Sequence, residues 1–307
     1  MLDNPKRLPS EASRTSASRY QQERQWRRKV ISLSRLPRMI PGIFRSKSAT
    51  FGLVILLFWV FVALAAPFVS PYSPTEMPSL PLQPPSQEHW LGTDHLGRDV
   101  VSRLFWGTRT VLLLAPIATL LGVLGGASLG LFSGYVGGKI DILIMRSCDI
   151  LMSFPMLLIY ILIITSIGPS ALNVVVSVSL GAIPSITRIV RSLVLEARNQ
   201  DYVNAARLRG ERRWYILFRE ILPNVSGPII ADACIRVGYA VMAIGSLGFL
   251  GLGVPPPTPD WGRMINEERV NLFIMPWAVL APSAALSSVV LALNMLSDGL
   301  KEIAQQR

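Results

Sequence analysis

The chain has 307 residues; half are hydrophobic and only 16% are charged, giving a mean hydropathy of +0.43. Soluble domains carry nearer a quarter charged residues, so the composition excludes an ordinary soluble domain and indicates an integral membrane protein. The net charge of +11 does not indicate a nucleic-acid partner, because the basic residues flank long apolar stretches, as in the cytoplasmic segments of membrane proteins. The two cysteines, Cys148 and Cys234, are too few for a metal cluster.

Residues 1–48 are predicted to form a basic cytoplasmic tail. This segment holds twelve Lys and Arg residues against three acidic ones. It is too long and too polar for a secretory signal, and residues 26–44 are expected to form a helix at the membrane interface. The tail therefore places the N-terminus in the cytoplasm.

Six apolar stretches are each about long enough to cross a bilayer core of roughly 30 Å at 1.5 Å per residue. They cover residues 49–69, 111–135, 141–167, 171–195, 225–254 and 277–297. Six spans that start inside also end inside, so both termini are predicted to be cytoplasmic. The predicted fold is an all-α membrane protein whose membrane domain covers residues 49–303.

The second and third spans carry packing and bending signals. Glycines recur at small-residue spacing through residues 122–134, which predicts a flat helix face for close packing against another helix. Gly137 and Gly138 predict a tight turn after this span. Pro155 predicts a kink in the third span.

Two pairs of opposite charges lie within the predicted spans, each pair on one helix face. Arg146 and Asp149 are three residues apart, and Asp232 and Arg236 are four apart. Each pair either neutralises itself as a structural ion pair or lies on the aqueous path, since charges within spans usually face the bundle interior. The sequence leaves both alternatives open.

The first outside loop, residues 70–110, begins with a proline-rich extended part. Asp99 then follows as a predicted cap of a short amphipathic helix, with Val100, Val101, Leu104 and Phe105 expected to face the membrane. This helix either steers the chain into the next span or meets an external partner. The loop's His89 and His95 are predicted to be surface residues, because a spacing of six does not place them on one helix face.

The segment 196–223, called the elbow below, is a charged island between two long apolar stretches. Asp201 is predicted to cap its first helix, Gly210 to form a left-handed turn, and Pro223 to end its second helix. Its surplus of arginine agrees with a cytoplasmic location. A bent pair of short helices between spans is typical of a surface that meets another protein.

The elbow also resembles the signature loop of membrane permease subunits of bacterial ATP-binding-cassette importers. Asn204-Ala205-Ala206 stands where the family has Glu-Ala-Ala, Gly210 matches its glycine, and Leu222-Pro223 matches its end. Asn204 departs from the family pattern and removes one carboxylate. The resemblance implies that the elbow docks in a groove of an ATPase subunit, with ATP and Mg bound there and no cofactor on this chain.

Further motifs resemble the dipeptide, oligopeptide and nickel branch of these permeases. They are Leu91-Gly-Thr-Asp94, Gly97-Arg98-Asp99, Phe249-Leu-Gly-Leu-Gly253 and the Pro-Thr-Pro-Asp-Trp-Gly run that contains Asp260 and Trp261. For Asp260 and Trp261 the alternative is a rigid loop with an interfacial tryptophan. The resemblance covers residues 45–303.

The resemblance implies an inner-membrane subunit that pairs with a second permease, two ATPase subunits and an external binding protein. Asp94, Arg98, Asp99, Asp260 and Trp261 are then candidate residues for meeting the binding protein. The substrate would be a di- or oligopeptide or a nickel-type solute. The sequence itself does not indicate which of these it is, nor which residues line the path.

Two other functions were weighed. An intramembrane enzyme is disfavoured, because the sequence shows neither a nucleophile–base–acid set in the membrane nor a metal constellation. The stronger alternative is a secondary, ion-coupled transporter. Such a protein would show internal repeats and broken helices with ion ligands at mid-depth, and no repeat is evident here.

Overall fold

A computed structural model of the chain describes residues 46–77 and 79–305. The predicted tail of residues 1–48 lies almost wholly outside this part, so its structure and the boundary at residue 48 stay predictions. The described residues are predominantly helical, with one isolated β-bridge between Thr93 and Asp99. The helical elements, in chain order, are α3 (Lys47–Val69), α4 (Val100–Val136), α5 (Gly138–Met152), α6 (Met156–Ile167), α7 (Ala171–Ala197), α8 (Asp201–Leu208), α9 (Arg213–Tyr215), the π-helix η2 (Ile216–Ile221), α10 (Leu222–Phe249), α11 (Trp261–Glu268), the 3₁₀ helix η3 (Arg269–Asn271) and α12 (Pro276–Gln305).

Five helical stretches of the described chain are long and apolar enough to cross a membrane: α3, α4, α7, the run from α9 through α10, and α12. The predicted third span, residues 141–167, does not form a single helix, so that part of the prediction is wrong. It is divided into α5 and α6, which meet at 88°. The break at Ser153–Pro155 confirms the position of the predicted bend, because a proline ring cannot continue the preceding turn.

Helix α4 is much longer than the predicted second span, since it begins at Val100 rather than Val111. Asp99 caps it as predicted, accepting a hydrogen bond from the Ser102 N–H at 2.7 Å. The prediction of a separate interfacial helix is wrong: Val100, Val101 and Leu104 are buried rather than facing the membrane, and Val100 and Leu104 belong to the main hydrophobic core. The apolar face of this first stretch packs against protein instead of lipid.

The glycine face of α4 packs against α7, as its spacing predicts. A Cβ added at Gly126 would lie 2.6 Å from Ile186 Cβ, and one at Gly130 would lie 2.7 Å from the Thr187 carbonyl oxygen. Only glycine permits the two backbones to approach this closely. The turn after α4 has φ +69° at Gly137 and +63° at Gly138, which also confirms the predicted tight turn.

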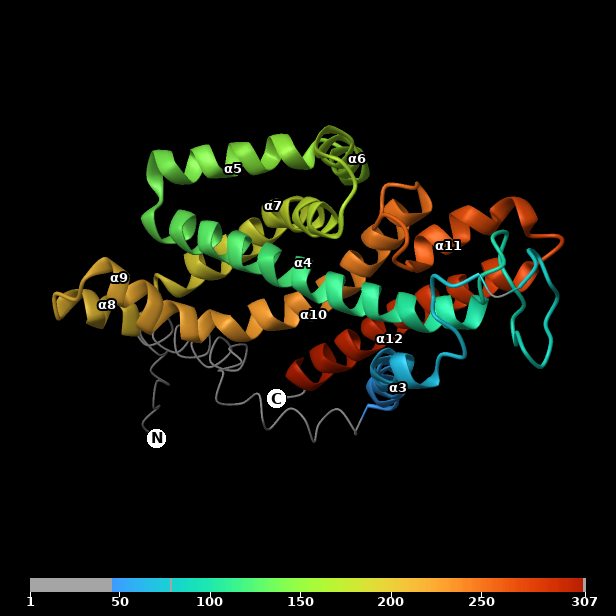
Figure 1. The fold of residues 1–307 in the computed structure, drawn as a ribbon. Coiled ribbons are helices and arrows are strands. Elements are labelled where there is room, and N and C mark those ends of the chain that lie inside the picture. Colours follow the sequence, from blue (N-terminus) through green and yellow to red (C-terminus); the bar gives the residue numbers. More distant parts are fainter. Residues whose placement is uncertain (1–45, 78, 306–307) are drawn as a thin grey trace, which may run out of the picture.

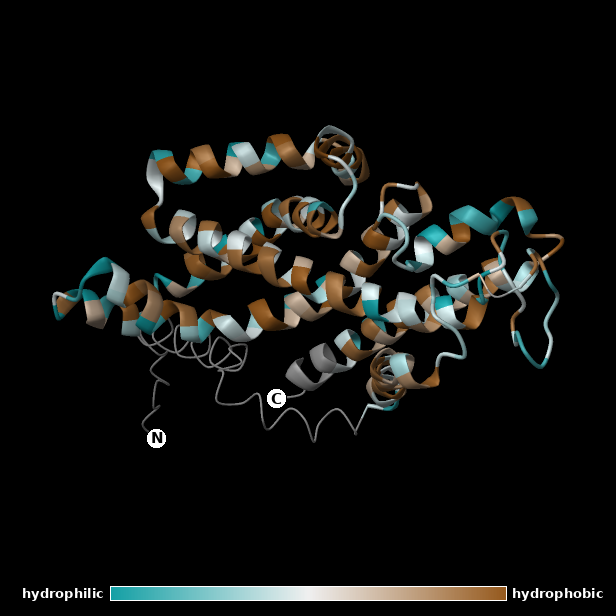
Figure 2. Cartoon of the chain, viewed as in Figure 1, coloured by the Kyte–Doolittle hydropathy of each residue, from teal (hydrophilic) through white to brown (hydrophobic). Residues whose placement is uncertain are grey.

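The long helices place two polar regions at opposite ends of the molecule (Figure 1). One end holds α8 and α9, and the other holds α11 with the loop before α4. Figure 2 shows hydrophobic residues along the middle of α3, α4 and α10 and hydrophilic residues at α8 and α11. This distribution is the one expected of a protein whose middle lies in lipid and whose ends lie in water.

Candidate functional site

The elbow is the first candidate site. Helix α8 begins at Asp201, but the residue at the cap position is Gln200, and no side-chain capping bond forms. The predicted capping role of Asp201 is therefore wrong. Its carboxylate lies in the first turn, where the positive end of the helix dipole still favours a negative charge.

Gly210 ends α8 in the left-handed conformation that the sequence predicts, with φ +77°. The Gly210 N–H donates to the Arg207 carbonyl at 2.9 Å, and the Glu211 N–H donates to the Ala206 carbonyl at 3.2 Å. These two bonds form a Schellman motif, which satisfies carbonyl groups at the helix end. A Cβ added at Gly210 would meet no atom within 4 Å, so the need for glycine comes from the backbone angle alone.

Pro223 does not end the second elbow helix, and that prediction is wrong. The chain runs from α9 through η2 directly into α10, with Pro223 in the first turn of α10. In η2 the Leu222 N–H bonds back to the Leu217 carbonyl, a spacing of five residues. Pro223 has no N–H to donate, but it lies where the π-helix η2 gives way to the α-helix α10. A proline is tolerated in this first turn, where the N–H has no required α-helical acceptor.

One side of the elbow is fastened to the bundle. Val203 and Ala206 of α8 and Ile221 of η2 have no exposed surface. They belong to a second hydrophobic core together with Val194 and Ala197 of α7. Apolar packing of this kind transmits displacement, because close-packed interiors have low compressibility.

The other side of the elbow is open. Asn204, Ala205 and Gly210 are exposed, and Leu208 keeps 90% of its surface accessible. Trp214 is 62% exposed and stacks on Phe218 with ring centroids 5.8 Å apart. Beside this face lies a cavity of about 380 Å³ lined by Tyr135, Val136, Arg207, Glu211, Arg213 and Ile216. A surface with exposed apolar side chains rimmed by charge is typical of a protein interaction site.

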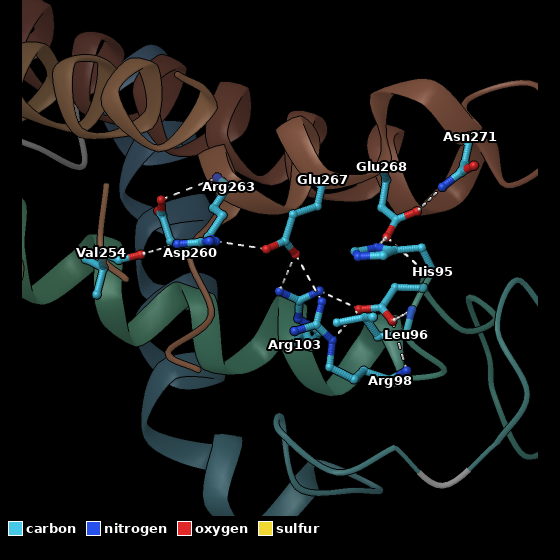
Figure 3. Close-up of polar contacts among 11 residues, drawn as sticks. His95, Leu96, Arg98, Arg103, Val254, Asp260, Arg263, Glu267, Glu268 and Asn271 are labelled. Atoms are coloured by element: carbon cyan, nitrogen blue, oxygen red, sulfur yellow. Dashed lines mark hydrogen bonds and ion pairs between the residues drawn. The ribbon is translucent and has the colours of Figure 1, made fainter. Parts of the chain in front are cut away.

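A second group of candidate residues, which we call the loop cluster, meets at the opposite end, where Arg98 and Arg103 point toward Glu267 of α11 (Figure 3). Asp94 is the hub of this cluster. One carboxylate oxygen of Asp94 accepts from the backbone N–H groups of Leu96 and Arg98 at 2.8 and 2.9 Å. The other accepts from Arg98 Nε at 2.7 Å and Arg103 Nη1 at 2.5 Å. The other members of the cluster are His95, Arg263, Glu267 and Glu268.

Helix α11 completes the loop cluster. Glu267 accepts from Arg98, Arg103 and Arg263 at 3.1, 2.9 and 2.8 Å. Burial alone would raise the pKa of Glu267, but the charges and hydrogen bonds of the surrounding arginines outweigh it and lower the pKa to about 2. The cluster is thus a network of internally paired charges that joins the loop before α4 to α11.

The prediction that both histidines are surface residues is wrong for His89, whereas the side chain of His95 is 34% exposed. His89 is only 2% exposed, and its Nδ1 lies 3.0 Å from Asp99 Oδ1. His95 pairs with the buried Glu268, with 2.6 Å between Nδ1 and Oε1. The loop folds back on itself through these contacts, which spacing along a helix does not anticipate.

The carboxylates of Asp94 and Glu268 and the ring of His95 offer ligand atoms within 4.8 Å of one another. Such spacing could hold a cation, but both oxygens of Asp94 already accept N–H donors, two of which come from arginine side chains. The positive charge of Arg98 and Arg103 at the same carboxylate disfavours a metal ion there. The donor set therefore fits ion pairing better than metal binding.

Asp260 and Trp261 lie at the start of α11, with Asp260 accepting from the Arg263 N–H at 3.4 Å. Trp261 is wholly buried, donates its indole N–H to the Leu104 carbonyl at 2.9 Å and meets Trp59 edge to face. The alternative of an interfacial tryptophan is therefore wrong. Asp260 is fully buried, and burial raises its pKa to about 6 against the opposing backbone N–H donors of Arg263 and Gly262.

The structure brings Asp94 and Arg98 together against α11, while Asp260 and Trp261 lie at the start of that helix. Asp99 instead caps α4 and contacts His89. The low exposure of these five candidate residues makes them the support of this end of the molecule rather than an open contact surface. Arg103, Arg263, Glu267 and Glu268 also belong to the cluster, and their roles were not predicted from the sequence. The spacing of Arg263 and Glu267, four residues apart on one helix, was a signal that could have found two of them.

Of the two charge pairs predicted within single helices, one forms and the other does not. The predicted pair of Arg146 with Asp149 is wrong, because Asp149 instead accepts from Arg188 of α7 at 2.7 Å. The bend at Pro155 brings α5 alongside α7, which favours the partner across the two helices. Asp232 and Arg236 do pair within α10, as predicted.

Comparisons with known proteins agree with this architecture. Residues 126–307 match the family model described as "Binding-protein-dependent transport system inner membrane component". Residues 42–85 match the "N-terminal TM domain of oligopeptide transport permease C".

Individual relatives extend the similarity over most of the chain. A dipeptide transport system permease protein from Alkalihalophilus pseudofirmus is 39% identical over 84% of this chain and 85% of its own. A glutathione transport system permease protein from Pectobacterium atrosepticum is 38% identical over 91% of this chain and 97% of its own. A di/tripeptide transport system permease protein from Pseudomonas aeruginosa is 38% identical, covering 84% of this chain and 87% of its own.

Proposed function

The chain belongs to the family of binding-protein-dependent transport system inner membrane components, and from that premise we propose that it is a permease subunit of an ATP-driven peptide importer. The relatives' names support a small peptide as the substrate: dipeptide, di/tripeptide and glutathione. A nickel-type solute stays a prediction of the sequence analysis alone. A multi-pass location in the inner membrane follows from the family and from the apolar helices.

The family depends on an ATPase and a binding protein, and we propose which end of the chain meets each. The elbow end would face the cytoplasm and contact one of two ATPase subunits, with ATP and Mg bound on those subunits. The opposite end, around α11, would face the binding protein. A second permease, related to this one, would complete the translocation path, and this chain would carry out no catalysis itself.

The observation that carries the proposal is the two-sided elbow. Its inner side is packed into a core shared with α4, α7 and α10, and its outer side leaves Leu208 and Trp214 exposed. A motion of the ATPases would press on the exposed side and reach α7 and α10 through the buried side. The permease bundle would thereby change from inward-facing to outward-facing.

Co-purification tests this proposal. We expect the tagged chain, extracted gently from membranes, to carry ATPase subunits that mass spectrometry identifies. Leu208→Asp should remove them, because it places a charge on the exposed apolar face. Leu80→Asp is the matched control, since Leu80 is a leucine with 72% exposure at the other end.

The outcome separates the two candidate functions. Recovery of ATPases with the Leu80→Asp chain but not with the Leu208→Asp chain would support an importer coupled through the elbow. A chain that purifies as an ATPase-free homo-oligomer would contradict it and favour the secondary transporter.

A further inference from the structure

A cavity of about 170 Å³ lies among the membrane-spanning helices, away from both ends of the molecule. Residues of α4, α6, α7 and α10 line it, including Tyr160, Ser185, Arg236 and Tyr239. Arg236 is 14 residues from the start of α10 and 13 from its end, and Ser185 is 14 from the start of α7 and 12 from its end. The cavity is thus near the middle of both helices, where a membrane is driest.

Arg236 presents an incompletely paired guanidinium to this cavity. Its Nε donates to Asp232 Oδ2, and its Nη1 donates to Ser185 Oγ at 2.8 Å. Within the part of the chain that the structure describes, neither Nη2 of Arg236 nor Oδ1 of Asp232 has a hydrogen-bond partner. One guanidinium donor of Arg236 therefore remains available at the cavity wall. The free carboxylate oxygen belongs to Asp232, which lies one helical turn away and does not line the cavity.

Two tyrosines shape the cavity. Tyr160 of α6 lies directly across Gly181 of α7, since a Cβ added at Gly181 would be 2.3 Å from the Tyr160 ring. Tyr239 of α10, 62% exposed, lies at the surface of this chain. Gly181 thus sets the position of one wall, and the cavity reaches the surface beside α10.

We propose that the Asp232–Arg236 pair and this cavity form a transient binding site for the charged end of a peptide during its passage through the membrane. The peptide carboxylate hydrogen-bonds the free Nη2 of Arg236, while Asp232, one helical turn away, remains paired with the Nε of the same guanidinium. Arginine suits this role, because its planar guanidinium retains donors for a second carboxylate after the first is bound. The inference rests on the proposed function, which supplies the substrate class.

The charge and size of the site favour this occupant. Arg236 is the charged residue among those that line the cavity, and its guanidinium matches the carboxylate end of a peptide. Pockets that enclose a complete small ligand usually measure about 300–1,000 Å³, so this smaller cavity receives one end of a peptide. The charged side chains are only 12% and 23% exposed, and charges at such depth usually face a substrate path or an internal cavity.

The test uses the complete transporter in proteoliposomes with saturating binding protein and a labelled dipeptide. Peptide uptake and ATP hydrolysis are measured together for the wild type, Arg236→Gln and the double variant Asp232→Asn/Arg236→Gln. Arg188→Gln is the matched control, because Arg188 also forms an ion pair, with Asp149, but is 50% exposed and does not line the cavity. We expect at least about tenfold lower uptake per ATP in both Arg236 variants, as for other hydrogen bonds to charged groups, and near-normal uptake in the control.

The double variant distinguishes substrate binding from a structural role. If the pair only stabilises the bundle, removing both charges leaves no unpaired charge, and uptake should return to near the wild-type rate. That recovery would overturn the inference and leave the proposed function intact. No ATP-dependent uptake by the wild type would overturn both.

A second measurement requires no variant. A dipeptide with a photoreactive C-terminal residue is cross-linked in the wild-type complex during turnover, and the labelled site is identified by mass spectrometry. We expect labelling at Met156, Tyr160 or Tyr239, all of which line the cavity. Labelling that avoids all of these residues would contradict the proposed site.

Discussion

The loop cluster and the elbow lie at opposite ends of the molecule and differ in the exposure and pairing of their side chains. In the loop cluster, Asp94 and Arg103 are buried and bonded to partners within the chain. In the elbow, Leu208 is 90% exposed and Trp214 is 62% exposed. Both regions are rich in arginine, so charge composition alone does not distinguish them.

In the loop cluster the polar groups are paired within the chain, whereas the elbow leaves one apolar side exposed for contact with another protein. A buried ion-pair network fixes the loop against α11 and has little capacity left for a new contact. The elbow keeps one packed side and one open side, which suits a part that must be pushed by another protein. Changes in the loop cluster should therefore affect folding first, whereas changes on the open side of the elbow should affect assembly and transport.

The largest effect is expected for Asp94→Ala. It leaves Arg98 and Arg103 without their buried carboxylate, and breaking a buried pair in this way costs about 3–5 kcal/mol. Thermal unfolding of the purified protein measures the loss. Glu88→Ala is the control, because Glu88 is exposed in the same loop and should change stability by less than about 0.5 kcal/mol. Equal melting temperatures for the two variants would show that the cluster is not structural.

The pH dependence of stability should also originate at the loop end. Asp260 has a pKa of about 6 in the folded protein against 3.8 in the unfolded chain, so the folded state holds more protons between these values. Its contribution to the free energy of unfolding should fall by about 3 kcal/mol as the pH rises from about 4 to 6, then stay constant. Asp260→Asn should remove this slope.

Glu267 provides the contrast with the opposite sign. Its folded pKa of about 2 lies below the ordinary 4.5, so its contribution is complete above pH 4.5 and is lost as the pH falls toward 2. Above pH 4.5, Glu267→Gln should change the free energy of unfolding by a constant amount. Its dependence on pH between 4.5 and 6, which comes from Asp260, should remain. A slope that survives in Asp260→Asn would refute the assignment.

Substitution of Gly210 is expected to have a smaller effect on stability but a large effect on the coupling of ATPase motion to peptide transport. Gly210→Val forces a β-branched residue into φ +77°, with strain of about 1–3 kcal/mol. Gly210→Asn is the matched control, since asparagine tolerates the left-handed region and the position has open space. Peptide uptake at equal expression should be lost for valine and retained for asparagine. Full uptake by the valine variant would show that the turn does not carry the coupling.

The smallest effect on stability is expected at Leu208. Leu208→Ala removes an exposed side chain and should change the free energy of unfolding by less than about 0.5 kcal/mol, while weakening ATPase binding. Leu217→Ala removes a leucine that is only 3% exposed in the same elbow and should cost about 2–5 kcal/mol. Similar melting temperatures for the two variants would mean that the elbow has no packed side.

The sequence predicted the helical class, most of the span positions and the elbow because these depend on local signals. Apolar runs, the glycine face of α4 and the left-handed Gly210 are each determined by neighbouring residues or by backbone geometry. The Asp232–Arg236 pair was predictable for the same reason, since its members are one helical turn apart.

The errors arise where distant segments decide the structure. Trp261 and Val100 were expected at the membrane interface or the membrane, but both are buried in a core built from segments far apart in the sequence. His89, expected at the surface, is buried because its own loop folds back on itself and brings it against Ser79 and Asp99. Asp149 pairs with Arg188, 39 residues away, because the 88° bend between α5 and α6 redirects α5. Spacing along one helix contains no information about such tertiary partners.

The most direct test of the central claim is uptake of a labelled dipeptide into proteoliposomes that contain this chain with its co-purified partners and the binding protein. We predict uptake that requires ATP and the binding protein and that proceeds without an ion gradient. Uptake driven by a proton or sodium gradient in the absence of ATP would contradict the account and identify a secondary transporter.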